Sequence, residues 1–187
     1  MAPDERKQHL LGVAIQVFAD KGLDGARHGD IAKAAGVSIP TVHSYFKTRT
    51  DLVTSVLNEV RRYVIHECTI PYIEGDSLEE RMMASGLNLG ARVATEPHYI
   101  KVWIMWGACF AEPFKALFED YEKEATGYLC QLIYGDAASA EDEELREKSR
   151  ILVGLSMFLA QMMLRGENEQ RQKTFMKNVM QTLQIWV

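Results

Sequence analysis

The residues best suited to chemistry lie between positions 38 and 48. A short helix is predicted over 39–46, because Ser38 is a good N-cap and Pro40 falls in the first turn, where its missing N–H costs nothing. Val42 and Phe46 lie one turn apart on this helix and are predicted to face the core. The other side chains are small or polar and include Ile39, Thr41, His43 and Ser44. Such side chains let a helix backbone approach base edges in the major groove of DNA.

Hydrogen-bond donors follow at the end of this helix. Tyr45 and Thr48 offer hydroxyls and Lys47 an ammonium, and all three can reach phosphate oxygens. Further candidates for DNA contacts are the basic pair Arg6 and Lys7, ahead of the apolar run of the first helix, and His28 and Gly29 at the start of the second helix. The predicted DNA-contacting residues are Arg6, Lys7, His28, Gly29, Ser38, Ile39, Pro40, Thr41, His43, Ser44, Tyr45, Lys47 and Thr48.

Two preceding helices and a tight turn must position these residues. Apolar residues repeat at three and four positions from Leu10 to Phe18, and the run stops at Lys21-Gly22, a normal helix end. A short helical segment follows at about 29–35, and Ala35-Gly36-Val37-Ser38 joins it to the next helix. Two short helices joined by a turn with a glycine are typical of a helix-turn-helix. A three-helix DNA-binding head is therefore predicted.

Helical periodicity continues along the rest of the chain. Helices are predicted from 49 to about 68, then over 77–95, 97–110, 113–132, 142–165 and 168–186. The sequence has no alternating strand pattern, no repeat and no low-complexity tract. The predicted fold is all-α with about nine helices, with a head over 1–48 and a regulatory and dimerisation body over 49–187.

Charge divides the chain in a similar way. The net charge is −5, and residues 1–49 hold seven basic and five acidic side chains, whereas the remainder holds 14 and 21. A basic head on an acidic body suits local phosphate binding, because a DNA duplex attracts the head and repels the body. The alternative is sampling noise in a short segment. A uniformly basic coat for nucleic acid is excluded.

Composition excludes other classes. With 47% hydrophobic and 25% charged residues, the chain is typical of a globular protein rather than a disordered or fibrous one. No apolar run reaches the roughly 18 residues of a membrane span, and the N-terminus lacks the apolar core of a secretory signal. The cysteines, Cys68, Cys109 and Cys130, are odd in number and lack metal-site spacing, which indicates a reducing cytoplasm.

Enzyme motifs are missing from the sequence. There is no glycine-rich phosphate loop, no HExxH and no GxSxG. His66-Glu67-Cys68 offers metal-capable groups, but adjacent residues on a helix point about 100° apart and do not easily share one ion. Neither an enzyme, nor a metal site, nor a cofactor is predicted.

Residues 6–55 carry a family pattern in order and without gaps: Ala14, Phe18, Lys21-Gly22, Ile31-Ala32, Ala35-Gly36-Val37-Ser38, Thr41, Tyr45-Phe46-Lys47 and Leu52. This pattern resembles the N-terminal signature of TetR-family transcriptional regulators. A closer resemblance, to the LuxR/HapR/SmcR quorum-sensing subgroup, rests on His28, Asp30-Ile31-Ala32, Val37-Ser38-Ile39, Thr41-Val42, Arg49, Asp51-Leu52-Val53, Lys101-Val102-Trp103 and Trp106. The resemblance implies a cytoplasmic homodimer that regulates transcription by binding a near-palindromic operator on double-stranded DNA.

Two departures limit what the resemblance implies. The subgroup has a basic arm that enters the minor groove, whereas only Arg6 and Lys7 precede Leu10 in this chain. The subgroup also has an asparagine where this chain has Ser44 and a small residue where it has Pro40. The operator sequence is therefore not carried over.

Large apolar side chains in the body allow two interpretations, a plain core or an apolar ligand pocket between helices. Trp103, Trp106 and Phe110 recur at three and four residues and are predicted to share one helix face. Because TetR-family proteins typically bind an inducer in this region, the resemblance favours a pocket for an apolar or amphipathic small molecule. Its predicted lining is Val64, Cys68, Trp103, Trp106, Phe110, Phe114, Phe118, Tyr121, Met157 and Gln161.

The penultimate helix is apolar on nearly all sides, so two opposite faces of this helix must be buried. It is either a single central helix of one bundle or a helix that also packs against a second copy of the chain. We predict a homodimer through the last two helices. The predicted interface residues are Leu152, Leu155, Phe158, Leu159, Met162, Phe175, Val179 and Leu183.

Two other functions fit the same residues. One is a TetR repressor of efflux or catabolic genes that a ligand releases from DNA. The other is a small-molecule-binding helical bundle whose DNA-binding head is weak, because the basic arm is short.

Overall fold

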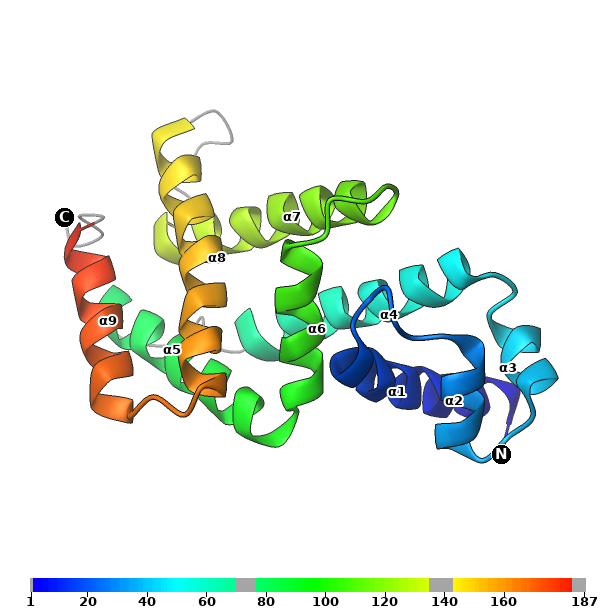
Figure 1. The fold of residues 1–187 in the computed structure, drawn as a ribbon. Helices are drawn as coiled ribbons and strands as arrows, with labels where there is room; N and C mark the ends of the chain where they lie inside the picture. Colours follow the sequence, from blue (N-terminus) through cyan, green and yellow to red (C-terminus); the bar gives the residue numbers. More distant parts are fainter. Residues whose placement is uncertain (1, 70–76, 135–142, 183–187) are drawn as a thin grey trace. The chain divides into compact units, whose positions relative to one another are not determined.

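The computed structural model describes residues 2–69, 77–134 and 143–182. These residues form nine α-helices and one π-helix and contain no strand, which confirms the predicted all-α fold. The chain divides into two compact units (Figure 1). Unit 1 comprises Met1–Tyr63 with His98–Leu117, and unit 2 comprises Val64–Pro97 with Phe118–Val187.

Unit 1 contains the predicted head. Its helices are α1 (Pro3–Lys21), α2 (His28–Ala35), α3 (Ile39–Tyr45), α4 (Arg49–Tyr63) and α6 (Pro97–Gly107). Helix α2 packs on both α1 and α3, and α1 packs on α4. The core consists of completely buried side chains at helical spacing, which include Leu10, Ala14, Phe18, Ile31, Val42, Leu52 and Val56. Burying these side chains is the main free-energy gain that holds the short helices α2 and α3 in place.

Unit 2 contains η1 (Val64–Thr69), α5 (Leu78–Thr95), α7 (Phe114–Tyr134, of which all but the first turn belongs here), α8 (Glu143–Leu164) and α9 (Glu169–Thr182). Helix α5 packs against η1, α8 and α9 (Figure 1). At Gly86 of α5, a Cβ atom would lie 2.1 Å from the Met176 methyl group on α9. Only glycine therefore lets α5 and α9 approach this closely without a shift of the methionine.

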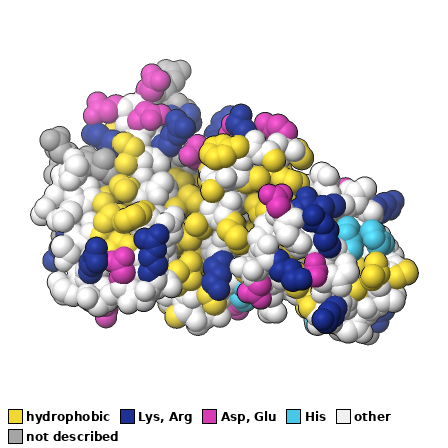
Figure 2. Space-filling view, in the orientation of Figure 1, with side chains coloured by type: hydrophobic (Ala, Val, Ile, Leu, Met, Phe, Trp, Pro, Cys, Tyr) yellow, Lys and Arg dark blue, Asp and Glu magenta, His cyan; other side chains and the backbone are white. Residues whose placement is uncertain are grey.

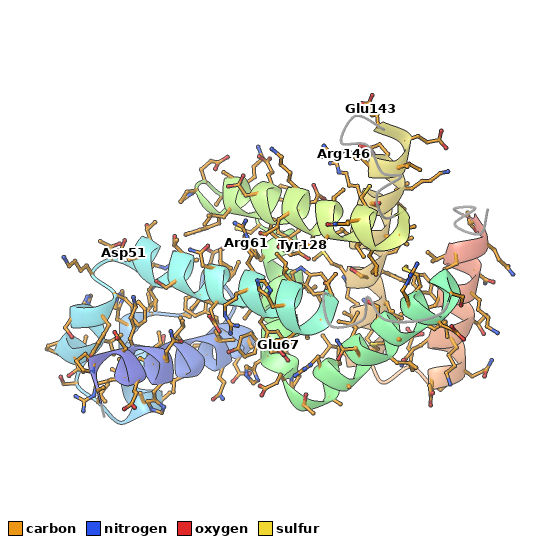
Figure 3. The ribbon with its side chains drawn as sticks, turned by 180° about the vertical axis from the view of Figure 1, so that it is seen from behind. Asp51, Arg61, Glu67, Tyr128, Glu143 and Arg146 are labelled. Carbon is orange, nitrogen blue, oxygen red and sulfur yellow. The ribbon has the colours of Figure 1, made fainter. Side chains whose placement is uncertain are left out.

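The predicted regular helix from 49 to about 68 is wrong in its last part, because Val64–Thr69 is a π-helix. Its carbonyl groups have partners that the local sequence does not reveal. The Asn88 amide donates to the carbonyls of Glu67 at 2.7 Å and Cys68 at 3.2 Å. Arg92 pairs with the carboxylate of Glu67 at 3.1 Å. Figure 3 labels Glu67. Polar groups of α5 thus hold the wide turn.

No helix among the described residues is both long enough and apolar enough to cross a membrane.

Candidate nucleic-acid interface

The turn between α2 and α3 has the expected geometry. Gly36 has φ of +66° and ψ of 32°, the left-handed conformation in which glycine is favoured. The Val37 N–H then donates to the Ala32 carbonyl at 3.0 Å. The Ser38 hydroxyl accepts from the Thr41 N–H at 3.3 Å and so caps α3. These local bonds confirm the helix-turn-helix that the sequence predicts.

Helix α3 has one buried side and one exposed side. Val42 is completely buried and Phe46, directly after the helix, is 1% exposed, as predicted. Ile39 is 51% exposed, and Pro40, His43 and Ser44 are also exposed. Val42 and Phe46 therefore hold the helix on its buried side, and both apolar and polar residues face solvent where a duplex can approach.

The polar side chains of α3 bond mainly to one another and to the backbone. The Ser38 and Thr41 hydroxyls lie 2.8 Å apart, and the Ser44 hydroxyl donates to the Thr41 carbonyl at 2.7 Å. The His43 Nδ1 lies 3.4 Å from the Lys47 carbonyl, which can only accept. These bonds fix the side-chain orientations before any DNA arrives.

His28, a predicted DNA contact, lies inside the head rather than on its surface. It is 8% exposed, and its Nε2–H donates to the Phe46 carbonyl at 2.8 Å. Its ring stacks on His43 with centroids 4.0 Å apart and planes 7° apart. Because the carbonyl can only accept, Nε2 carries the proton. The ring therefore links the start of α2 to the end of α3 and positions the recognition helix.

The residues after α3 combine capping with exposed charge. Thr48 and Asp51, the latter labelled in Figure 3, cap α4 reciprocally, because each backbone N–H donates to the other's side chain at 3.0 Å. Arg49 donates to the Leu23 carbonyl and is thereby tied to the turn before α2. Lys47 is exposed, and no hydrogen bond or ion pair of its ammonium is found among the described residues. Its charge is well placed for a phosphate.

Basic residues elsewhere in the head are arranged differently. Arg6 and Lys7 are exposed on α1, which already begins at Pro3, so they are helical rather than part of an extended arm. The Lys21 ammonium pairs with Asp30, and this hydrogen bond, followed by that from the Arg27 N–H, holds the Asp30 pKa below its ordinary value. Asp30 therefore stays ionised and caps α2.

The residues predicted for a ligand pocket divide between the two units. In unit 1, Trp103 and Trp106 are buried on α6, and the Trp106 indole donates to the Phe114 carbonyl at 2.8 Å. The prediction that Phe110 shares their helix face is wrong, because α6 ends at Gly107 and Phe110 is 83% exposed. In unit 2, the rings of Phe118 and Tyr121 lie 5.4 Å apart. The other predicted lining residues there are Val64 and Cys68, both buried, and Met157 and Gln161, both half-buried.

Unit 2 also holds a cavity that the sequence does not predict. It has a volume of about 450 Å³ and lies between α5, α8 and α9. Its lining includes Leu87, Gly90, Val93, Met163, Leu164 and Gln172, none of which belongs to the predicted pocket.

The predicted dimer-interface residues have different exposures in the single chain. Leu152, Leu159 and Met162 are buried within unit 2, whereas Phe158 and Ile151, which also lies on α8, are 45% and 46% exposed. Phe175 of α9 is half-buried and its ring lies 5.4 Å from that of Phe158. Figure 2 shows hydrophobic side chains gathered over α8. Leu155 and Val179 are half-buried, and Leu183 lies outside the described residues.

Sequence reasoning missed the roles of two residues in these sites. Asn88 is 6% exposed and bonds two carbonyls that lie 21 and 20 positions away. Arg49 bonds a carbonyl 26 positions away. No local pattern marks either partner. An asparagine within an otherwise apolar helix stretch is a signal that could have drawn attention to Asn88.

Among known proteins, bacterial regulatory proteins of the tetR family match residues 10–56. The HTH-type transcriptional regulator LuxR of Vibrio harveyi is 36% identical over 119 residues, which cover 63% of this chain and 58% of LuxR. The regulator AcrR of Shigella flexneri is 38% identical over 52 residues, covering 28% of this chain and 24% of AcrR. The chain therefore spans less than two thirds of either relative.

Solved structures share the fold over nearly the whole chain. A tetR-family transcriptional regulator from Streptomyces coelicolor aligns with a TM-score of 0.76 at 21% identity, covering 98% of this chain and 82% of that one. AibR, in complex with isovaleryl coenzyme A and operator DNA, aligns with a TM-score of 0.70 at 12% identity, covering 94% and 97%. The chain is therefore similar to TetR-family transcriptional regulators, in sequence over the helix-turn-helix and in fold over nearly its whole length.

Proposed function

We propose that the protein is a homodimeric, cytoplasmic regulator of the LuxR/HapR quorum-sensing type that binds a near-palindromic operator on double-stranded DNA. Residues 1–48 form the DNA-binding domain and residues 49–187 the regulatory and dimerisation domain. The main support for the proposal is that α3 has one buried side and one exposed side. Val42 and Phe46, directly after the helix, are buried, whereas Ile39, Pro40 and Ser44 are exposed. The 36% identity to LuxR over 119 residues supports the subgroup.

Each head contributes one recognition helix. In a two-fold symmetric dimer the two α3 helices enter successive major grooves about 34 Å apart. Base edges then face the exposed side of α3, and phosphates face Tyr45, Lys47 and Thr48. Arg6 and Lys7 contribute charge from α1. His28 supports α3 from inside the head, because its ring contacts the Phe46 carbonyl and the His43 ring, whereas Gly29 stays a proposed DNA contact.

Dimerisation is proposed through α8 and α9. Ile151 and Phe158 expose apolar surface on α8, and Phe175 of α9 lies beside Phe158. Covering such surface with a second copy removes it from water. Phe158→Glu places a charge in this contact, so the variant is expected to be a folded monomer by sedimentation, while Asn178→Glu on the polar side of α9 stays dimeric. A folded Phe158→Glu dimer excludes this interface.

A salt titration and a genomic selection test the DNA-binding function. Binding of the full-length protein to a random duplex is expected to weaken linearly on a log–log plot against salt. Fragments of the source genome that the protein retains are expected to share a two-fold symmetric site. Thr41→Ala and Ser44→Ala should each weaken binding to that site by about 1–3 kcal/mol and leave random-duplex binding unchanged. Salt-independent binding, or no shared site, contradicts the proposal.

As a second proposal, an apolar or amphipathic small molecule regulates the protein. Binding of this ligand would release the protein from DNA, as in repressors of efflux or catabolic genes. The buried Trp103 and Trp106 support it, and AibR was solved with both isovaleryl coenzyme A and operator DNA. A ligand acts only if it binds the DNA-bound and free conformations unequally. Decanoate is a suitable probe, with tryptophan fluorescence and operator affinity as readouts. A change in fluorescence that Trp106→Phe abolishes is expected, and no response in either readout across short and long amphiphiles contradicts the pocket.

A further inference from the structure

The first turn of α3 presents an exposed apolar pair. Ile39 is 51% exposed and Pro40 beside it is exposed as well. The Cδ1 atom of Ile39 lies against α2, where a Cβ on Gly29 would be only 3.7 Å away. One edge of the isoleucine therefore lies beside Gly29 of α2, and the rest of the side chain is exposed. Neither residue is needed in the core that Val42 and Phe46 already fill.

The hydroxyl groups on this helix have few protons left to donate to base edges, although their oxygens can still accept hydrogen bonds from bases. The Ser44 hydroxyl proton goes to the Thr41 carbonyl, and the Ser38 and Thr41 hydroxyls share one proton between them. Of three hydroxyl protons, one remains for DNA. Residues 39–45 contain no Arg, Lys, Asn, Gln, Asp or Glu, so α3 itself lacks the side chains that bond guanine or adenine in a bidentate manner.

The major groove offers one apolar group, the C5-methyl of thymine. The N-terminal residues of a recognition helix are those that contact base edges. We propose that Ile39 and Pro40 contact thymine methyl groups in each operator half-site and so add to the sequence preference that Thr41 and Ser44 give it. This proposal rests on the proposed DNA-binding function and adds the chemistry by which the operator is chosen.

Replacing thymine by deoxyuridine removes only the methyl group and so tests the contact directly. The probe is the duplex recovered by genomic selection, synthesised with deoxyuridine at each thymine in turn, and its affinity for the full-length protein is measured by fluorescence anisotropy. At one or two positions in each half-site the affinity is expected to fall about fourfold, the equivalent of about 0.8 kcal/mol for one buried methyl group.

Protein variants then assign the contact. Ile39→Ala is expected to bind the thymine duplex more weakly and to lose the response to deoxyuridine at those positions. Leu87→Ala, at an equally exposed leucine (51%) on α5, is the matched control and should keep the full response. Ile39→Val, which removes one methylene, should show an intermediate response and serves if the alanine variant does not fold.

Two results overturn the proposal while DNA binding stands. One is equal affinity of the wild-type protein for thymine and deoxyuridine duplexes at every position. The other is a folded Ile39 variant that retains the wild-type response. Failure to bind any duplex in a salt-dependent manner instead overturns the proposed function, and this inference with it.

Discussion

The buried hydrogen bond of His28 makes a quantitative prediction about the head. His28→Phe keeps an aromatic ring that can stack on His43, but it removes the Nε2–H that donates to the Phe46 carbonyl at 2.8 Å. His28→Gln does the reverse, because its amide retains a donor at similar reach and lacks the ring. The two variants therefore separate the hydrogen bond from the stacking contact.

The expected loss follows from the burial of the histidine. At 8% exposure, water does not readily replace the missing donor, so the Phe46 carbonyl is left without this partner. An unsatisfied buried acceptor costs about 1–3 kcal/mol. With a urea dependence of about 2 kcal/mol per molar, the His28→Phe unfolding midpoint should fall by about 0.5–1.5 M.

Tryptophan fluorescence can report this transition from unit 1. Trp103 and Trp106 belong to that unit, whereas Trp186 lies outside the described residues. For this measurement Trp186→Phe is introduced into the wild-type protein and into every variant, so that only Trp103 and Trp106 fluoresce. His9→Phe, at an exposed histidine on α1, is the control and should leave the midpoint unchanged. Equal midpoints for His28→Phe and wild type would refute the reasoning, as would a His28→Gln variant that is less stable than His28→Phe.

Three further changes test other contacts. Lys47→Ala should weaken binding to all DNA sequences alike and lower the salt slope by about one unit, and an unchanged slope would place Lys47 away from phosphate. Asn88→Leu should lower the free energy of unfolding by about 1–3 kcal/mol in urea titrations, because two π-helix carbonyls lose their donor, whereas Asn178→Leu on exposed α9 should not. Burial raises the Cys68 pKa to about 12, so the folded thiol stays protonated while the unfolded thiol ionises from its ordinary value of 9.0. Stability should therefore fall between pH 9 and 12, and the fall should be smaller in Cys68→Ala, as measured by unfolding at each pH.

The head could be predicted from sequence because its determinants are local. The Ser38 cap, the left-handed turn at Gly36 and the one-turn spacing of Val42 and Phe46 each involve residues within four positions. The function of His28 could not be predicted in this way, since its partner carbonyl lies 18 positions away. A polar residue at a helix start fits a phosphate contact and an internal hydrogen bond equally well.

After the head, helical periodicity alone predicts neither the end of α6 nor which residues of α8 are exposed. The spacing from Trp103 to Trp106 and Phe110 continues past Gly107, but a helix ends where its backbone loses partners, and spacing alone does not mark that point. On α8, apolar residues occupy nearly every face, so the pattern could not separate the buried Leu152 and Leu159 from the exposed Phe158. The positions of α5 and α9 against α8 resolve that ambiguity.

The separation of anchoring and exposed residues on α3 has a consequence for protein engineering. Val42, Phe46 and His28 hold the helix from behind, whereas Ile39, Pro40 and Ser44 contribute almost nothing to that anchoring. Positions 39, 40 and 44 can therefore be randomised as a library while the scaffold keeps its fold. Natural divergence can take the same path, so relatives that retain the anchor can acquire new targets by exchanging a few surface side chains.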